Sequence, residues 1–277
     1  MKRKNFKHWG LFIALQFITL SLFAQGPNNT GTYYQNANGK KGKALKTAMF
    51  KIISKHNQLS YDGLWTAFRT TDMREDGNVW DMYSCTTNFR FGTDQAGRYK
   101  KEGDVYNREH SFPKSWFGGK TMPMYTDLVH LVPTDGYVNG MRSNYPFGET
   151  DGGKYKSNKG FSKLGSCTYP GYTGIVFEPN DMYKGDFARI YFYMATAYED
   201  KIANWNAGEF APIASHDSYK PYKDWQMNML MEWAKKDPVS QKEIDRNKGI
   251  QQQQNNRNPF VDYPGCLLYT SPSPRDS

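Results

Sequence analysis

An acid and a base stand side by side in the stretch YNREHSFPKSWFGG, residues 106–119. Glu109 supplies a carboxylate, which suits a hard cation, and His110 supplies an imidazole, which can abstract a proton near pH 7. Adjacent side chains of a regular strand point to opposite faces, so both can serve one site only at a strand end or a bulge. The flanking Asn107 and Pro113 favour such an irregular position. Taken alone, a Glu–His pair is more typical of an ordinary surface or core contact than of a functional site.

A second group of polar residues follows in TDGYVNGMRSN, residues 134–144. Thr134 or Asp135 can cap a helix that continues to about Arg142. On this helix Asp135, Asn139 and Arg142 are spaced i, i+4 and i+7, so they share one face. A carboxylate, an amide oxygen and a guanidinium on one face could bind a metal and a phosphate. A capped, solvated helix explains the same spacing, and from the spacing alone it is the better interpretation.

The elements that must position these residues indicate one α+β domain. Apolar residues at helical spacing and capping residues predict helices, β-like apolar runs predict strands, and a composition rich in Gly, Lys and Ser predicts a surface loop. We see neither repeats nor a linker that would separate two domains. The predicted helices are residues 43–55, a short element at 64–68, 135–142, 186–200 with Asp186 as the cap, 224–235 and 239–252; the predicted strands are 80–87 and 127–133, and the predicted loop is 148–174.

The N-terminal residues 1–24 indicate export. Four basic residues precede an apolar run over residues 11–23, and Ala24 provides a small residue for cleavage. The run is short for a membrane span, which leaves a membrane anchor as the weaker alternative. The segment holds four of the 36 Lys and Arg and none of the 27 acids, so the mature chain retains 32 basic residues and a net charge of +5. Such a charge is compatible with a polyanionic partner without being diagnostic of one.

The three cysteines and the C-terminal residues carry less information. Cys85 and Cys167 can pair in an oxidising compartment or remain as buried free thiols. After Gly265 the chain changes character and reads CLLYTSPSPRDS, residues 266–277, which we interpret as a non-native tail that replaces the native end. A natural Ser/Pro-rich end is the alternative. His130 lies in the apolar run DLVHLVP, where we expect a hydrogen-bonded core histidine or, failing that, a residue that supports the site.

Three long motifs together resemble the endonuclease I family. They are YNREHSFPKSWFGG, DLVHLVPTDGYVNGMRSNYPFGE and VFEPNDMYKGDFARIYFYMATAY, and the late RNPFVDYP extends the resemblance, which covers about residues 61–263. Members of this family are exported nucleases of the ββα-metal, or His-Me finger, superfamily. The resemblance therefore implies a nuclease domain over residues 25–265, built around a ββα motif with several surrounding helices.

The resemblance also implies a role for four residues. His110 matches the general base, and Glu109 and Asn139 match the two protein ligands of one Mg²⁺ ion, for which Mn²⁺ or Ca²⁺ can substitute in binding. The family holds the phosphate with an arginine that has no secure position here. Arg142 is the first candidate for that role, because of its helical register, and Arg108 is the second. One carboxylate and one amide suffice because Mg²⁺ keeps several waters and binds substrate oxygens.

The expected function is that of a secreted or periplasmic, Mg²⁺-dependent, sequence-nonspecific endonuclease. It would act as a monomer, without membrane contact after signal removal, and would hold DNA by the phosphate backbone and leave 5′-phosphate ends; RNA remains open as a second substrate. One alternative is an exported nucleic-acid-binding protein that kept the fold and lost the chemistry. The other is a phosphodiesterase that acts on small substrates. The presence of Glu109, His110 and Asn139 favours the nuclease.

Overall fold

The computed structural model describes residues 26–205, 208 and 210–266; the predicted signal segment and residues 267–277 of the tail lie outside this part. The described residues form an α+β fold with seven α-helices and two small sheets. No helix among them is long and apolar enough to cross a membrane. The helices are α2 (Gly42–Ile53), α3 (Gly63–Thr71), α4 (Gly136–Arg142), α5 (Lys184–Ala197), α6 (Asp224–Lys236), α7 (Gln241–Gln254) and α8 (Pro259–Asp262).

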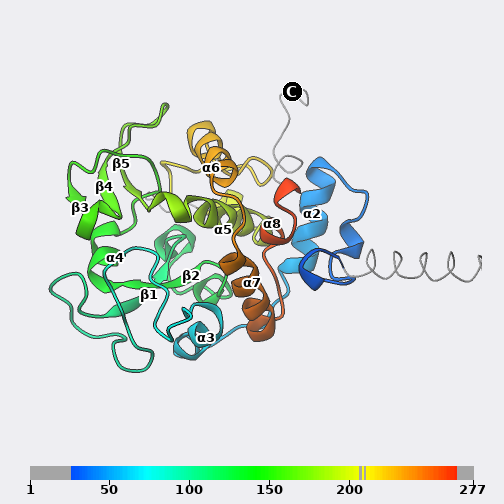
Figure 1. Ribbon diagram of the computed structural model, residues 1–277. Helices are drawn as coiled ribbons and strands as arrows, with labels where there is room; N and C mark the ends of the chain where they lie inside the picture. Colours follow the sequence, from blue (N-terminus) through cyan, green and yellow to red (C-terminus); the bar gives the residue numbers. More distant parts are fainter. Residues whose placement is uncertain (1–25, 206–207, 209, 267–277) are drawn as a thin grey trace, which may run out of the picture.

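The smaller sheet pairs β1 (Tyr106–His110) with β2 (Leu131–Asp135) in antiparallel register. His110 pairs with Leu131, and Asp135, the last residue of β2, is also the residue that caps α4. Strand, strand and helix therefore follow one another as a ββα unit, which Figure 1 shows beside α3. The second sheet has the order β3 (Tyr155–Lys156), β4 (Lys163–Ser166) and β5 (Ile175–Glu178), also antiparallel.

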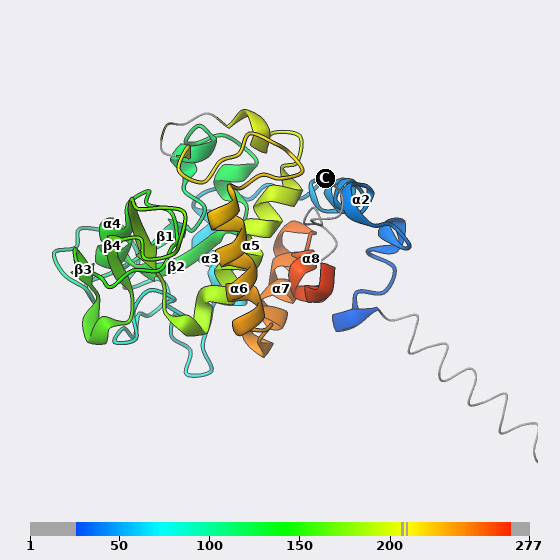
Figure 2. The same cartoon turned by 90° about the horizontal axis from the view of Figure 1, so that it is seen from above.

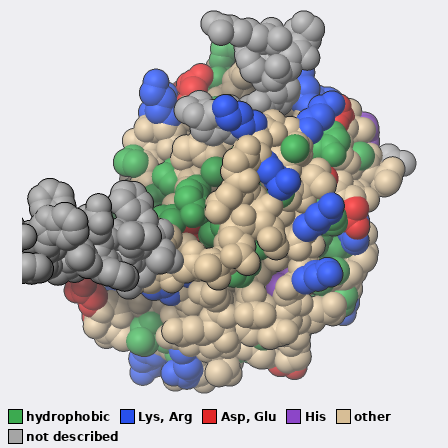
Figure 3. All heavy atoms as spheres, turned by 90° about the vertical axis from the view of Figure 1, so that its right-hand side faces the viewer, with side chains coloured by type: hydrophobic (Ala, Val, Ile, Leu, Met, Phe, Trp, Pro, Cys, Tyr) green, Lys and Arg blue, Asp and Glu red, His purple; other side chains and the backbone are tan. Residues whose placement is uncertain are grey.

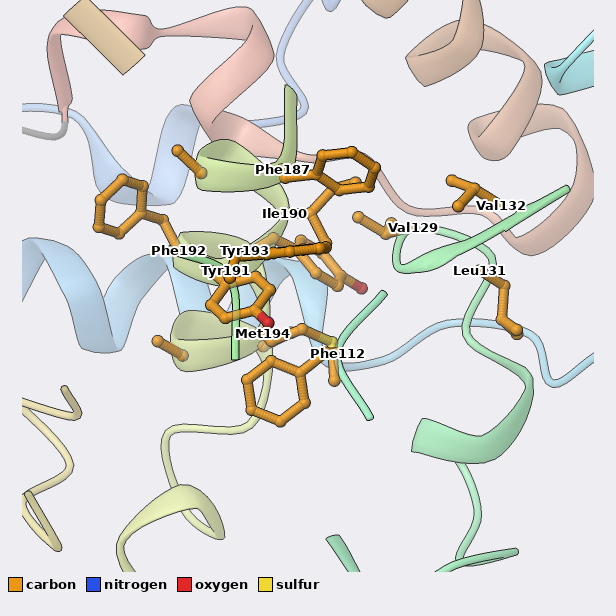
Figure 4. Packing of buried hydrophobic residues seen from close by; sticks show 14 of the residues in the cluster. Phe112, Val129, Leu131, Val132, Phe187, Ile190, Tyr191, Phe192, Tyr193 and Met194 are labelled. Atoms are coloured by element: carbon orange, nitrogen blue, oxygen red, sulfur yellow. The ribbon is translucent and has the colours of Figure 1, made fainter. Parts of the chain in front are cut away.

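Helix α5 forms the centre of the core. Every residue from Lys184 to Ala197 is buried, because the helix is apolar or aromatic on most faces and packs against α2, α6 and α8. Figure 4 shows Tyr191 of this helix beside Phe112, which lies beyond the end of β1, while Phe187 and Phe192 point in other directions. Figure 2 shows α6 and α8 beside the helix. The phenyl ring of Phe112 lies 5.2 Å from the ring of Tyr191, centroid to centroid. The core helix thus supports the loop that follows the Glu–His pair.

Several predicted elements are confirmed, with shifts of a few residues. Helices α2, α4, α6 and α7 appear where the periodicity places them, and α7 begins with a capping box in which Ser240 and Glu243 bond reciprocally. Helix α5 begins two residues earlier than expected, with Tyr183 as its N-cap, so Asp186 lies in the first turn rather than at the cap. Strand β2 begins at Leu131, later than the apolar run suggests.

Two predictions for the intervening segments are wrong. Residues 80–87 form no strand, because the side chain of Asp81 bonds the backbone N–H groups of Tyr83 at 2.8 Å and Ser84 at 3.2 Å and so turns the chain. Residues 148–174 are more than a surface loop, since β3 and β4 lie within them and β5 follows directly. Short strands between Gly and Ser residues give no clear period, which is why composition alone missed them.

Candidate active site

Glu109 and His110 lie at the end of β1 and line the same pocket. The strand ends at His110, so the alternation of side chains breaks where the sequence predicts. The pocket has a volume of about 400 Å³. Its lining residues are Tyr61, Trp65, Ala96, Gly97, Asn107, Arg108, Glu109, His110, Pro113, Lys114, Asn139, Gly140, Arg142, Ser143 and Asn144. All four residues singled out from the sequence as site residues are in this group.

One ring nitrogen of His110 is fixed by the backbone. Its Nε2 lies 3.0 Å from the carbonyl oxygen of Tyr125. Because a carbonyl only accepts, the neutral imidazole carries its proton on Nε2 and its lone pair on Nδ1. Burial, followed by the neighbouring His130, lowers the pKa of His110 well below its usual value. The imidazole is therefore neutral at pH 7, with Nδ1 as its basic atom.

Aromatic rings hold the plane of the imidazole. The ring of Tyr125 stacks on His110 with centroids 5.3 Å apart and planes 17° apart. Tyr61 stacks in turn on Tyr125 at 4.6 Å. Tyr125 thus restrains His110 twice, through its carbonyl and through its ring, so that the imidazole has little freedom to rotate.

Glu109 has one occupied and one free carboxylate oxygen. Its Oε1 accepts hydrogen bonds from the Tyr83 hydroxyl at 3.0 Å and from Nη1 of Arg142 at 2.8 Å. Its Oε2 accepts no side-chain hydrogen bond from the residues that the structure describes. Burial raises the pKa of the Glu109 carboxyl, and Arg142 opposes this shift. The carboxylate is held from one side and keeps its second oxygen for another ligand.

From the sequence, Arg142 is expected to face a phosphate, but the structure buries its side chain. Its side chain is 1% exposed. Besides Glu109, its guanidinium donates to the carbonyl oxygens of His110 at 3.0 Å and Ser111 at 2.7 Å. It also lies over the ring of Phe147, 4.9 Å from the centroid. The helical register did bring Arg142 to the site, but beneath the Glu–His pair, where it braces Glu109 and the end of β1.

Asn139 and Asp135 have separate roles despite their common helix face. Asp135 caps α4 by accepting from the N–H of Val138 at 2.8 Å, and it also accepts from Gly103 at 2.6 Å. It does not line the pocket. Asn139 does line it, is half-buried, and its side chain has no hydrogen-bond partner among the described residues. Its amide oxygen is therefore free to bind a ligand opposite Glu109.

Two further cations line the pocket. Arg108, the second candidate for a phosphate ligand, lies over the rings of Tyr61 at 3.5 Å and Trp65 at 4.2 Å, and its Nη1 donates to the Tyr61 carbonyl at 2.6 Å. Lys114 is exposed at the mouth of the pocket, on the 3₁₀ turn Lys114–Phe117. Arg108 also pairs with the exposed Asp62 at 3.1 Å. The three cations that line the pocket still outnumber its one lining carboxylate, Glu109, which favours a polyanionic substrate.

Sequence reasoning missed the aromatic supports of the site. Tyr83 bonds Glu109 from a segment that the pattern misread as a strand, and Tyr61, Trp65 and Tyr125 come from segments with no distinctive motif. Their only signal is the high aromatic content of 16%. His130 is a buried core histidine that bonds the carbonyl of Met124 at 2.7 Å, as the apolar run predicts.

The oxygen donors of the pocket fit a hard divalent cation. Among the residues that the structure describes, no group of three or more His, Cys, Asp or Glu side chains could hold a metal ion. What the pocket offers instead is the free Oε2 of Glu109 and the free amide of Asn139. Mg²⁺ suits such a sparse set, because it keeps several waters and usually takes one or two protein ligands. Cys85 and Cys167 are not paired with each other, Cys85 is exposed rather than buried, and neither lines the pocket.

Comparison with known proteins agrees with this geometry. The family model for endonuclease I matches residues 41–265. An extracellular ribonuclease of Bacillus amyloliquefaciens is 38% identical over 256 residues, which cover 85% of this chain and 76% of the relative. A periplasmic deoxyribonuclease of Aeromonas hydrophila is 26% identical over 232 residues, which cover 79% and 84%. An endonuclease-1 of Buchnera aphidicola subsp. Baizongia pistaciae is 26% identical over 204 residues, which cover 70% and 73%.

The family match covers most of the described residues and includes every residue that lines the pocket. The relatives are named as extracellular or periplasmic, which agrees with the export signal expected from the sequence. We conclude that the chain belongs to the endonuclease I family and is an exported nuclease, secreted or periplasmic.

Proposed function

We propose that the protein is a Mg²⁺-dependent, sequence-nonspecific endonuclease that hydrolyses the phosphodiester bonds of DNA and RNA. The observation that carries this proposal is the meeting of three groups in one pocket: the free Nδ1 of His110, the free Oε2 of Glu109 and the unpaired amide of Asn139. Nucleases of this family are generally metal-dependent, and the oxygen donors present suit Mg²⁺. Mn²⁺ or Ca²⁺ would substitute in binding.

In this proposal His110 is the general base. Its Nδ1 accepts a proton from the water that attacks phosphorus, and the Tyr125 carbonyl stabilises the imidazolium that results. Glu109 and Asn139 would hold one Mg²⁺ ion, which neutralises charge on the phosphate and on the leaving oxygen when bound. Loss of the 3′ oxygen as leaving group gives products with 5′-phosphate and 3′-hydroxyl ends.

Arg142 acts in this scheme as a positioning residue. It donates a hydrogen bond to Oε1 of Glu109, which leaves Oε2 for the metal ion. It also fixes the backbone of His110 and Ser111 through their carbonyl oxygens. The phosphate would instead meet Arg108 and Lys114, which line the pocket with donors to spare. We propose Arg108 as the main phosphate ligand, because stacking on Tyr61 and Trp65 restrains its guanidinium in advance.

Recognition of the backbone rather than of base edges explains why both nucleic acids are proposed as substrates. The pocket presents cations and an amide, and phosphate contacts carry no sequence information. The relatives are named as a ribonuclease and as a deoxyribonuclease, so both chemistries occur among similar chains. We propose a monomer as the active form, since Glu109, His110 and Asn139 already meet in one pocket without a second chain.

Digestion of supercoiled plasmid and of single-stranded RNA, with Mg²⁺ and with EDTA, tests the proposal. We expect cleavage of both substrates that EDTA abolishes, random cut sites, and fragments that a ligase can join without prior phosphorylation. A small phosphodiester such as bis(p-nitrophenyl) phosphate serves as a control substrate. Binding without cleavage would contradict the proposal in favour of a binding protein, and efficient turnover of the small diester alone would favour a small-substrate phosphodiesterase.

A further inference from the structure

The positive charge of the chain is concentrated in one segment. Residues 26–61 contain six lysines and no acidic residue. Residues 62–277 contain 26 Lys and Arg against 27 Asp and Glu, which leaves a net charge of −1. Beyond the predicted signal segment, the whole net charge of +5 therefore comes from α2 and the residues around it. Solvation of the helix explains why α2 carries lysines. It does not explain why Asp and Glu are absent from residues 26–61.

Most of these lysines stand free on one surface. Lys40, Lys41, Lys43, Lys51 and Lys55 are exposed, and none of them forms an ion pair with a residue that the structure describes. Lys43 and Lys51 are eight residues apart on α2, a rise of about 12 Å along the helix axis. A groove of about 570 Å³ runs along this face, lined by Asn36, Lys40, Lys43, Ala44, Thr47, Ala48, Lys51, Ile52 and Tyr219. No carboxylate is among these lining residues.

Side chains beneath the groove fix its floor. Thr47 donates to Oε1 of the buried Glu199 at 2.7 Å and lies 3.0 Å from the Tyr219 hydroxyl. The ammonium group of Lys43 lies 5.1 Å from the centroid of the Tyr219 ring. The sixth lysine, Lys46, is buried and bonds the carbonyl of Ser218. Glu199 accepts this bond on Oε1, and its Oε2 is buried without a partner among the described residues. Glu199 forms no ion pair with the exposed lysines, which remain available to an outside anion.

This surface lies away from the catalytic pocket. In Figures 1 and 2, which share their horizontal axis, α2 lies at the right-hand end and the β1–β2–α4 unit in the left half. Figure 3 looks onto the α2 end and shows Lys and Arg side chains at several places on the face, with fewer acidic ones. The two positive regions are therefore separate, and they share no lining residue.

We propose that the α2 surface, defined as Lys40, Lys43 and Lys51 with Tyr219, binds the phosphodiester backbone of a second stretch of the nucleic acid that is being cleaved. Repeated phosphates match a row of unpaired lysines, because binding releases the counterions condensed on the polymer. A polymer held there raises the effective concentration of its own bonds at the pocket. The inference rests on the proposed nuclease function and adds to it a preference for long substrates.

The test compares two triple variants of the full chain. Lys40→Gln/Lys43→Gln/Lys51→Gln removes the α2 surface, and Lys235→Gln/Lys236→Gln/Lys248→Gln removes the same charge from α6 and α7. Binding to a 60-nucleotide strand and to a hexanucleotide is measured by anisotropy in Ca²⁺ at several salt concentrations. Cleavage of both substrates in Mg²⁺ gives kcat/KM. At about 0.7 per phosphate contact on single strands, the log–log salt slope for the long strand should fall by about 2 in the α2 variant only.

The expected result is a lower kcat/KM for the long strand, with hexanucleotide cleavage unchanged, in the α2 variant and not in the control. Equal salt slopes in the two triple variants would overturn the inference. So would an α2 variant that loses binding to vesicles of anionic phospholipid while its nucleic-acid binding is unchanged, since the surface would then serve a membrane. If the wild type cleaves nothing, the nuclease proposal fails, and the salt slopes still decide whether α2 binds the backbone.

Discussion

Replacing Arg142 by Met tests whether this residue braces Glu109 or holds the phosphate. The change removes one partner of a buried ion pair, together with the donors to the carbonyls of His110 and Ser111. Breaking a buried pair in this way costs about 3–5 kcal/mol, because an uncompensated charge is left behind. Since domains are stable by about 5–15 kcal/mol, the variant should still fold. Urea denaturation should show this loss, and the Mg²⁺ concentration for half-maximal cleavage should rise.

A double-mutant cycle with Glu109→Gln sharpens the test. Gln keeps the size of Glu109, and in the double variant it leaves no unpaired charge. The free energy of unfolding should therefore fall by less in the double variant than the sum of the losses in the two single variants. Binding of DNA in Ca²⁺ should change little in Arg142→Met, because the guanidinium is buried. The reasoning is refuted if Arg142→Met unfolds at the wild-type urea concentration while its affinity for DNA collapses. Arg142 would then be the phosphate ligand after all.

Three other predictions concern single residues. Asn139→Ala should shift the Mg²⁺ titration of cleavage to higher concentration with unchanged thermal stability, because its amide has no partner to lose; an unmoved titration curve would exclude Asn139 as a ligand. His110 should titrate below pH 6.5 in the metal-free protein, because burial and His130 lower its pKa, and an NMR titration in EDTA that gives a higher value would contradict this. Asp81→Ala should lower the free energy of unfolding, measured by urea denaturation, by at least about 1–3 kcal/mol, since it leaves the N–H groups of Tyr83 and Ser84 without their acceptor. Glu75→Ala, at an exposed acid, is the control.

Local signals predicted the parts of the site that depend on neighbouring residues in sequence. The flanking Asn107 and Pro113 indicated that β1 ends near the Glu–His pair, and it ends at His110. Asp135 as a cap and the period of 3.6 placed α4 correctly and brought Asn139 and Arg142 to one pocket. Such features are short-range, so one sequence contains enough information to find them.

Long-range side-chain contacts could not be predicted in the same way. The register of α4 places Arg142 on the correct face but says nothing of what lies beneath it, and burial against Glu109 changes its proposed role. Tyr83 bonds Glu109 from 26 residues away, in a segment turned by Asp81. The pattern WDMYSCTT predicted a strand there, because a side chain that bonds the nearby backbone leaves no mark on the sequence pattern.

Single-turnover cleavage by His110→Ala tests the central proposal most directly. A labelled duplex is cut in Mg²⁺ by wild type and variant, and filter binding in Ca²⁺ measures affinity in parallel. A positioned general base contributes about 10²–10⁴-fold to rate, so the variant should lose at least about 100-fold in cleavage and bind nearly as the wild type does. Cleavage at the wild-type rate would remove His110 from the mechanism, and an equal loss of binding and cleavage would make it a structural residue.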